Sequence, residues 1–152
     1  MEKELRFAIF FCQRLDPDQD VNRRALEKEL GPRIKFFPLP CSGRIEALHL
    51  MRALEAGADK VFLITCPIGA CRYREGNMRA GKRLGFAQKL VGEIGLESER
   101  FELVHASSVG PTSVDAIARE LINREQRIAV SPLNAKKEKK KRALHHDTVR
   151  DA

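Results

Sequence analysis

The chain has 152 residues, of which 43% are hydrophobic and 32% charged, with a formal net charge of +7. This length predicts one domain with a single hydrophobic core. The apolar runs are far shorter than the roughly 20 residues that cross a bilayer, and the charged start leads into no secretory segment, so we expect a cytoplasmic protein. Thiols stay reduced in that compartment, so the four cysteines favour metal binding or catalysis over disulfides.

The positive charge is concentrated near the C-terminus. Residues 136–152 hold seven Lys or Arg against three acids, a net +4, which leaves +3 of the total +7 for the rest of the chain. Because this segment lacks apolar periodicity, we expect it to be a basic disordered tail. Residues 127–133, which precede it, are expected to form a short edge strand or an extended arm, so that residues 127–152 together are an arm and a tail. The charge therefore does not predict nucleic-acid binding.

The first half of the chain alternates strand and helix patterns. A nearly continuous apolar run at residues 5–11 predicts a buried strand that ends at Cys12. Apolar residues at helical spacing follow (Val21, Ala25, Leu26, Leu30), and Gly31-Pro32 ends that helix. Residues 33–39 predict a second strand, which ends before Cys41. Ser42 is expected to cap a second helix, which Gly57 terminates.

The second half repeats the pattern. Residues 60–65 predict a third strand, and residues 75–94 a long helix with Ile94 inward. Four basic residues form a stripe that we expect to face solvent: Arg79, Lys82, Arg83 and Lys89. Residues 101–106 predict a fourth strand, and residues 112–115 a capping box that opens a fourth helix.

Four alternations of strand and helix predict an α/β fold. Right-handed crossovers give a single small three-layer domain with a four-stranded parallel sheet, in the order 2-1-3-4 of a flavodoxin-like half. In that order, each of three neighbouring strands is followed by a cysteine: Cys41, Cys12 and Cys66. Cys71 comes shortly after Cys66 in the sequence. Because the carboxyl ends of parallel strands share one edge, the thiols are expected to meet there as a cluster of soft ligands.

Four thiolates suit zinc, a 2Fe-2S cluster or a 4Fe-4S cluster, and the residue types leave these open. The loops at Cys41 and Cys66 both lead from a strand towards a helix, where backbone amides favour negative charge. Gly43 and Gly69 would let the backbone approach a cluster closely. The arginines of these loops would stabilise its reduced form: Arg44, Arg72 and Arg74.

Three motifs resemble one family: Cys41-Ser-Gly-Arg44, Gly57-Ala-Asp59, and Cys66-x2-Gly69-x-Cys71-x-Tyr73-x2-Gly76-Asn77. Together they are similar to the delta, or iron-sulfur, subunit of methyl-viologen-reducing hydrogenase. The resemblance implies an electron-transfer domain at residues 1–126 with one 2Fe-2S cluster. It would relay electrons between a hydrogenase or other dehydrogenase module and a flavin-containing, heterodisulfide-reductase-A-like subunit. The chain itself would not be catalytic.

The resemblance implies that the metal ligands are Cys12, Cys41, Cys66 and Cys71, with Gly43, Arg44, Gly69 and Arg72 around the cluster. The chain departs from the family pattern in two places. The N-terminal motif, typically Cys-Cys-Asn-Trp-Cys, reads Phe11-Cys12-Gln13-Arg14-Leu15, so Leu15 replaces a cysteine. Pro67, Ala70 and Arg72 stand where the family usually has His, Asp and His.

Two other functions fit parts of the sequence. Cys66-x5-Arg72 between a strand and a helix is typical of cysteine phosphatases and arsenate reductases, although Tyr73 stands where they place Ser or Thr. A structural zinc site in an interaction domain would use the same thiols. We expect His49 and His105 to be surface or hydrogen-bonded core residues rather than ligands.

Overall fold

The computed structural model confirms the predicted α/β fold. It describes residues 5–15, 21–67, 76–106, 113–124, 126, 128–134 and 143. All strand pairs are parallel, and the sheet has the order β2-β1-β3-β4. The strands are β1 (Phe7–Cys12), β2 (Ile34–Leu39), β3 (Lys60–Thr65) and β4 (Phe101–His105).

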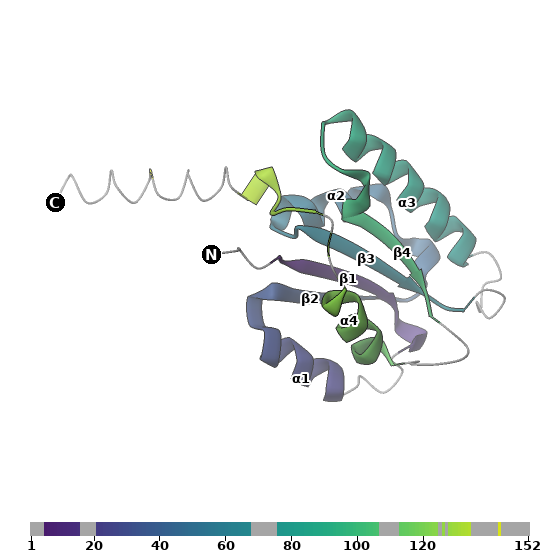
Figure 1. Cartoon of the computed structure of the whole chain (residues 1–152). Coiled ribbons are helices and arrows are strands. Elements are labelled where there is room, and N and C mark those ends of the chain that lie inside the picture. The colour runs from purple at the N-terminus through teal and green to yellow at the C-terminus, as the bar shows by residue number, and fades with distance from the viewer. Residues whose placement is uncertain are drawn as a thin grey trace.

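Helices cover both faces of the sheet, as Figure 1 shows. Among the described residues, the main α-helices are α1 (Val21–Leu30), α2 (Ala47–Ala56), α3 (Gly76–Glu93) and α4 (Val114–Asn123). α2 and α3 lie on one face and α1 and α4 on the other. Within the described part of the chain, no helix is long and apolar enough to cross a membrane.

The central strands are buried on both sides, which explains their continuous apolar runs. Successive residues of β1 point to opposite faces. Ala8 and Phe10 belong to the α2/α3 core, whereas Phe7, Ile9 and Phe11 belong to the α1/α4 core. The sheet therefore divides the interior into two cores.

The second helix starts later than expected. Ser42 does not cap it, because Ser42–Arg44 forms a separate 3-10 turn and α2 begins only at Ala47. Ile45, which is fully buried in the α2/α3 core, pulls the intervening segment inward. Glu46 is the N-cap, and its backbone N–H donates to Nδ1 of His49 at 3.1 Å. His49 is thus an exposed capping residue, which agrees with the prediction of a surface or hydrogen-bonded residue.

Several apolar positions near helix ends are more exposed than expected. Val21 and Ile94 are 78% and 62% exposed, because one opens α1 and the other lies just beyond the end of α3. Ala25 also faces solvent, whereas Leu26 is buried. α4 has Ser113 as its N-cap without a side-chain capping bond, and Thr112 lies outside the described residues.

Residues 128–134 form an arm rather than an edge strand, and the arm is not fully extended, because residues 132–134 form a short helical turn. The arm lies at the end of the sheet where the strands begin (Figure 1). Its anchor is Asp59, which is 1% exposed. One carboxylate oxygen accepts from the backbone N–H of Ser131 at 2.7 Å and from Nδ2 of Asn134 at 2.8 Å. The other accepts from the Arg6 N–H at 2.8 Å.

Arg100 strengthens the same junction. Its side chain is fully buried, and Nη1 donates to the carbonyl oxygens of Asp59 at 2.9 Å and Ala129 at 3.1 Å. Nε donates to the carboxylate of Glu97 at 2.7 Å. The pKa of Glu97 is lowered by its own backbone N–H and then by Arg100. The Gly57-Ala-Asp59 motif therefore serves to fasten the arm.

Candidate metal centre

The described cysteines lie at the end of the sheet opposite the arm. Cys12 is the last residue of β1, and Cys66 directly follows β3. Cys41 comes two residues after the end of β2. Because these strands are neighbours in the order β2-β1-β3, the thiols follow adjacent strands at the carboxyl edge, as the sequence predicted.

Cys12 and Cys66 form a close pair of thiols. Their Sγ atoms are 3.5 Å apart, and each residue is only 4% exposed. A disulfide would require about 2.0 Å. Two thiolates bound at about 2.3 Å to one tetrahedral metal ion lie about 3.8 Å apart, so the observed separation fits two ligands of a single ion.

The Cys41 loop supplies an amide donor to sulfur. Cys41 is 8% exposed and precedes the 3-10 turn Ser42–Arg44. Its Sγ accepts from the N–H of Gly43 at 3.4 Å, and its carbonyl oxygen accepts from the N–H of Arg44 at 3.0 Å. Donors to a cysteine sulfur favour its thiolate and tune any metal bound to it.

Gly43 is in close contact with the first residue of α3. A Cβ added to Gly43 would lie 2.8 Å from Cα and 3.0 Å from the carbonyl oxygen of Gly76. Real Cβ atoms do not approach so closely, so only glycine fits here. The sequence predicted that the Gly43 backbone would lie close to a cluster. In the structure, Gly43 instead lets the Cys41 loop pack closely against the first residue of α3.

Arg83 is not part of a solvated stripe. It is partly buried, and its Nη1 donates to the carbonyl oxygens of Gly43 at 2.7 Å and Ile45 at 2.8 Å. The other three residues of the stripe are exposed, as predicted: Arg79, Lys82 and Lys89. Arg83 therefore ties the Cys41 loop to α3.

A groove of about 620 Å³ opens beside this loop. Its lining includes Cys41 and Gly43 from the loop and Gly76 from α3. Four charged residues also line it: Arg44, Glu46, Arg79 and Arg83. The groove thus combines a thiol with a net positive lining.

A hydrogen-bonded pair, which the sequence analysis missed, supports the backbone at Cys66. Thr65 is fully buried, and its hydroxyl donates to the carbonyl oxygen of Cys66 at 3.1 Å. The same Oγ1 lies 2.6 Å from Nδ1 of His105 on β4, which fits an Nδ1–H that donates to the hydroxyl. His105 is an exposed, hydrogen-bonded residue, as expected. The sequence could have revealed this contact only if the register of β3 and β4, which places Thr65 beside His105, had been known.

Part of the predicted site lies outside the described residues: Gly69, Cys71, Arg72 and Arg74. Among the residues that are described, no three His, Cys, Asp or Glu side chains lie close enough together to hold a metal ion. The site shown is therefore the Cys12–Cys66 pair with the Cys41 loop on the adjoining strand. The phosphatase-like alternative, which depends on Arg72, has no described geometry.

Fold and site together define a small parallel α/β domain with thiols gathered at the carboxyl edge of its sheet. Residues 8–129 match the model of the family described as methyl-viologen-reducing hydrogenase, delta subunit. The chain belongs to this family, which confirms the resemblance seen in its motifs.

Individual relatives carry related names. The chain is 28% identical over 102 residues to the iron-sulfur subunit of the F420-non-reducing hydrogenase vhu of Methanocaldococcus jannaschii, which covers 67% of this chain and 76% of that protein. The iron-sulfur subunit of the F420-non-reducing hydrogenase of Archaeoglobus profundus is 43% identical over 79 residues, 52% of this chain and 58% of the relative. The A component of the ferredoxin:CoB-CoM heterodisulfide reductase of Methanosarcina mazei is 33% identical over 75 residues, which is 49% of this chain but 10% of that component.

Proposed function

We propose that the chain is an electron-transfer subunit that binds one 2Fe-2S cluster at the carboxyl edge of its sheet. The observation that carries this proposal is the pair of Cys12 and Cys66, whose sulfur atoms are 3.5 Å apart. Their separation suits two thiolates on one iron ion, and Cys41 and Cys71 are the proposed ligands of the other. Several relatives are named as iron-sulfur subunits, which supports iron over zinc.

The surrounding residues would set the electrostatics of the site. Such a cluster, when bound, accepts and donates single electrons. The Gly43 N–H already donates to the sulfur of Cys41 at 3.4 Å, and Arg44 lies in the same turn. Donors and positive charge near the thiolates favour the more negative, reduced state and so raise the reduction potential. We assign the same role to Gly69 and Arg72.

The proposed partners are a heterodisulfide-reductase-A-like flavoprotein and a hydrogenase or other dehydrogenase module, in a cytoplasmic complex. One relative supports the first of these. In the heterodisulfide reductase component of Methanosarcina mazei, the segment similar to this chain is about 10% of a much longer polypeptide. A related domain is thus covalently joined to a reductase polypeptide in that protein.

Serine substitution of the paired cysteines tests the site. After anaerobic reconstitution with iron and sulfide, Cys66→Ser and Cys12→Ser should each lose most of the visible absorption of the wild-type protein. Far-ultraviolet circular dichroism should be unchanged, because neither cysteine belongs to the two hydrophobic core clusters and serine is close to cysteine in size. Ala25→Ser on the exposed side of α1 is the control and should keep the full spectrum.

Two results would contradict the proposal. One is a Cys66→Ser protein with an undiminished iron-sulfur spectrum. The other is global unfolding of Cys66→Ser in the absence of metal, which would assign the thiol to core packing.

A further inference from the structure

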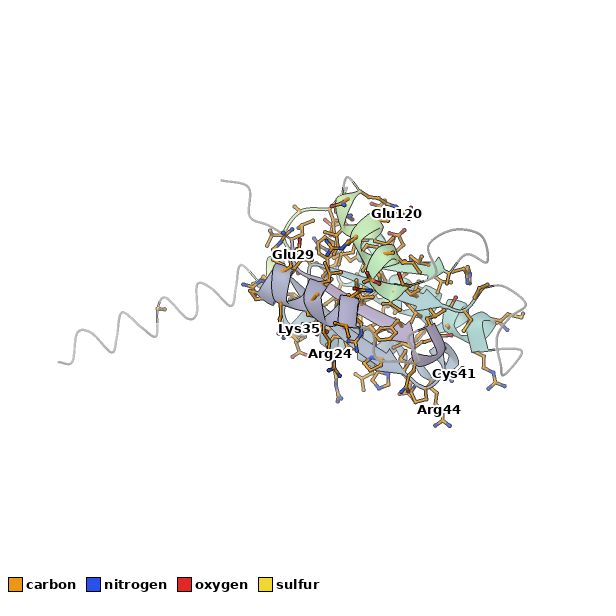
Figure 2. All side chains as sticks on the ribbon, turned by 90° about the horizontal axis from the view of Figure 1, so that it is seen from below. Arg24, Glu29, Lys35, Cys41, Arg44 and Glu120 are labelled. Atoms are coloured by element: carbon orange, nitrogen blue, oxygen red, sulfur yellow. The ribbon has the colours of Figure 1, made fainter. Side chains whose placement is uncertain are left out.

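The groove beside Cys41 is built from fixed backbone and exposed positive charge. Arg83 holds its floor in place through the carbonyl oxygens of Gly43 and Ile45. Arg44 and Arg79, by contrast, are exposed at its border. In Figure 2, Arg44 projects outward from the ribbon close to Cys41. Three arginines against one carboxylate, Glu46, make the lining suited to an acidic ligand.

Two large apolar side chains are exposed at the same end of the molecule. Leu48 is 53% exposed in the first turn of α2, and Met78 is 64% exposed in the first turn of α3. The two helices pack side by side and both begin at the carboxyl edge of the sheet. Exposed apolar residues with flanking charges are typical of protein interfaces, where methionine and arginine are enriched.

We propose that Arg44, Leu48, Met78 and Arg79 form a docking surface for an acidic patch on the redox partner protein. We call this set the docking surface. The charge of the groove selects a partner that carries carboxylates, and the two apolar side chains favour a protein surface over a small anion. Since Cys41 lines the same groove, a partner seated there would lie directly against the thiol-bearing edge.

This inference rests on the proposed electron-transfer function, because it assumes that a redox partner docks. Beyond that function, the inference specifies the surface on which the partner binds and the charged and apolar contacts that hold it there. Close approach matters, since electron tunnelling weakens steeply with distance, and opposite charges speed the encounter of two proteins.

Charge reversal on the docking surface tests the inference. The probe is the heterodisulfide-reductase-A-type flavoprotein from the same organism. The readout is the dissociation constant of its complex with the reconstituted 152-residue chain, measured by biolayer interferometry at low salt. The double variant Arg44→Glu/Arg79→Glu should weaken binding about tenfold or more. Wild-type binding should also weaken as salt rises, because exposed charges are screened.

The control has the same change in net charge elsewhere. Lys28→Glu/Lys89→Glu reverses two exposed lysines, on α1 and on α3 away from the groove, and should bind nearly as the wild type does. Equal weakening by both double variants would overturn the docking surface in favour of a general charge effect. Unchanged binding of Arg44→Glu/Arg79→Glu, or no binding by the wild type, would also overturn it.

The iron and sulfide contents of each variant separate the two proposals. Because Arg44 also lies beside the proposed cluster, the single variant Arg79→Glu carries this comparison. Full iron and sulfide together with weakened binding in Arg79→Glu supports the inference. A wild-type chain that binds the flavoprotein in the same way but holds no iron would contradict the cluster and leave the docking surface standing.

Discussion

At the scale of single residues, the contact between Gly43 and Gly76 is the tightest constraint at the site. In Gly43→Ala the new methyl group would meet the Gly76 Cα at 2.8 Å, and both partners are backbone, so the loop must move. We expect a loss of about 1–3 kcal/mol in the free energy of unfolding, measured by urea denaturation of the metal-free protein.

Gly85→Ala is the matched control for this substitution. Gly85 is an exposed position inside α3 with nothing within 4 Å of an added Cβ. Alanine should stabilise the helix there by about 0.5–1 kcal/mol. A Gly43→Ala protein as stable as Gly85→Ala would show that the loop is not packed as described.

Asp59 is the second residue with a large expected effect. Its buried carboxylate accepts hydrogen bonds from Arg6, Ser131 and Asn134. Asp59→Ala leaves these donors unsatisfied, so we expect a loss of about 3 kcal/mol or more in the free energy of unfolding. Glu55→Ala, on the exposed face of α2, should change stability by less than about 0.5 kcal/mol. Similar effects of the two substitutions would argue against the anchored arm.

Between elements, Arg83 joins α3 to the loop that carries Cys41. Arg83→Met keeps most of the side-chain volume but removes both bonds to the loop carbonyls. The Arg44 and Ile45 amides, which donate to Cys41 and Ser42, should then exchange hydrogen faster in mass-spectrometric exchange. Arg52→Met on the exposed side of α2 should leave this exchange unchanged. If these amides exchange at the same rate in Arg83→Met as in the wild type, the Cys41 loop does not depend on Arg83 for its structure.

A surface ion pair links α1 to α4 and gives a pH dependence. Nη2 of Arg119 lies 2.8 Å from Oε2 of Glu29, and the Arg119 hydrogen bond and charge lower the pKa of Glu29. A lowered carboxyl pKa in the folded state adds stability at neutral pH, which is lost as the pH falls through that pKa. Glu29→Gln should therefore be slightly less stable than the wild type at pH 7, and the difference should shrink as the pH falls below the ordinary range of a glutamate side chain. A difference that grows on acidification would contradict this sign.

The elements themselves were predictable because they depend on local pattern. Continuous apolar runs marked the buried strands, and β3 was predicted with its observed bounds. The contacts that shape the site were not predictable in this way. Arg83 has the helical spacing of a solvated basic residue, and its partners lie 40 and 38 residues earlier. Likewise, Ser42 is a good capping residue by type, but the burial of Ile45 delays the helix.

At the scale of the whole molecule, the two ends of the sheet differ in character. The end where the strands begin is closed by buried polar bonds among Asp59, Arg100 and the arm. The carboxyl end carries Cys12, Cys41 and Cys66, the groove and the exposed apolar residues of the docking surface. Topology alone predicted that the thiols would follow neighbouring strands at this end, because β2, β1 and β3 are neighbours. Their pairing required the three-dimensional structure, since Cys12 and Cys66 are 54 residues apart.

The most direct test of the central claim is the composition of the chain purified without oxygen. The proposed 2Fe-2S centre requires about two iron ions and two acid-labile sulfides per chain, and an electron paramagnetic resonance signal that appears on reduction. Stoichiometric zinc, or a colourless protein without metal that hydrolyses an aryl phosphate, would contradict the account.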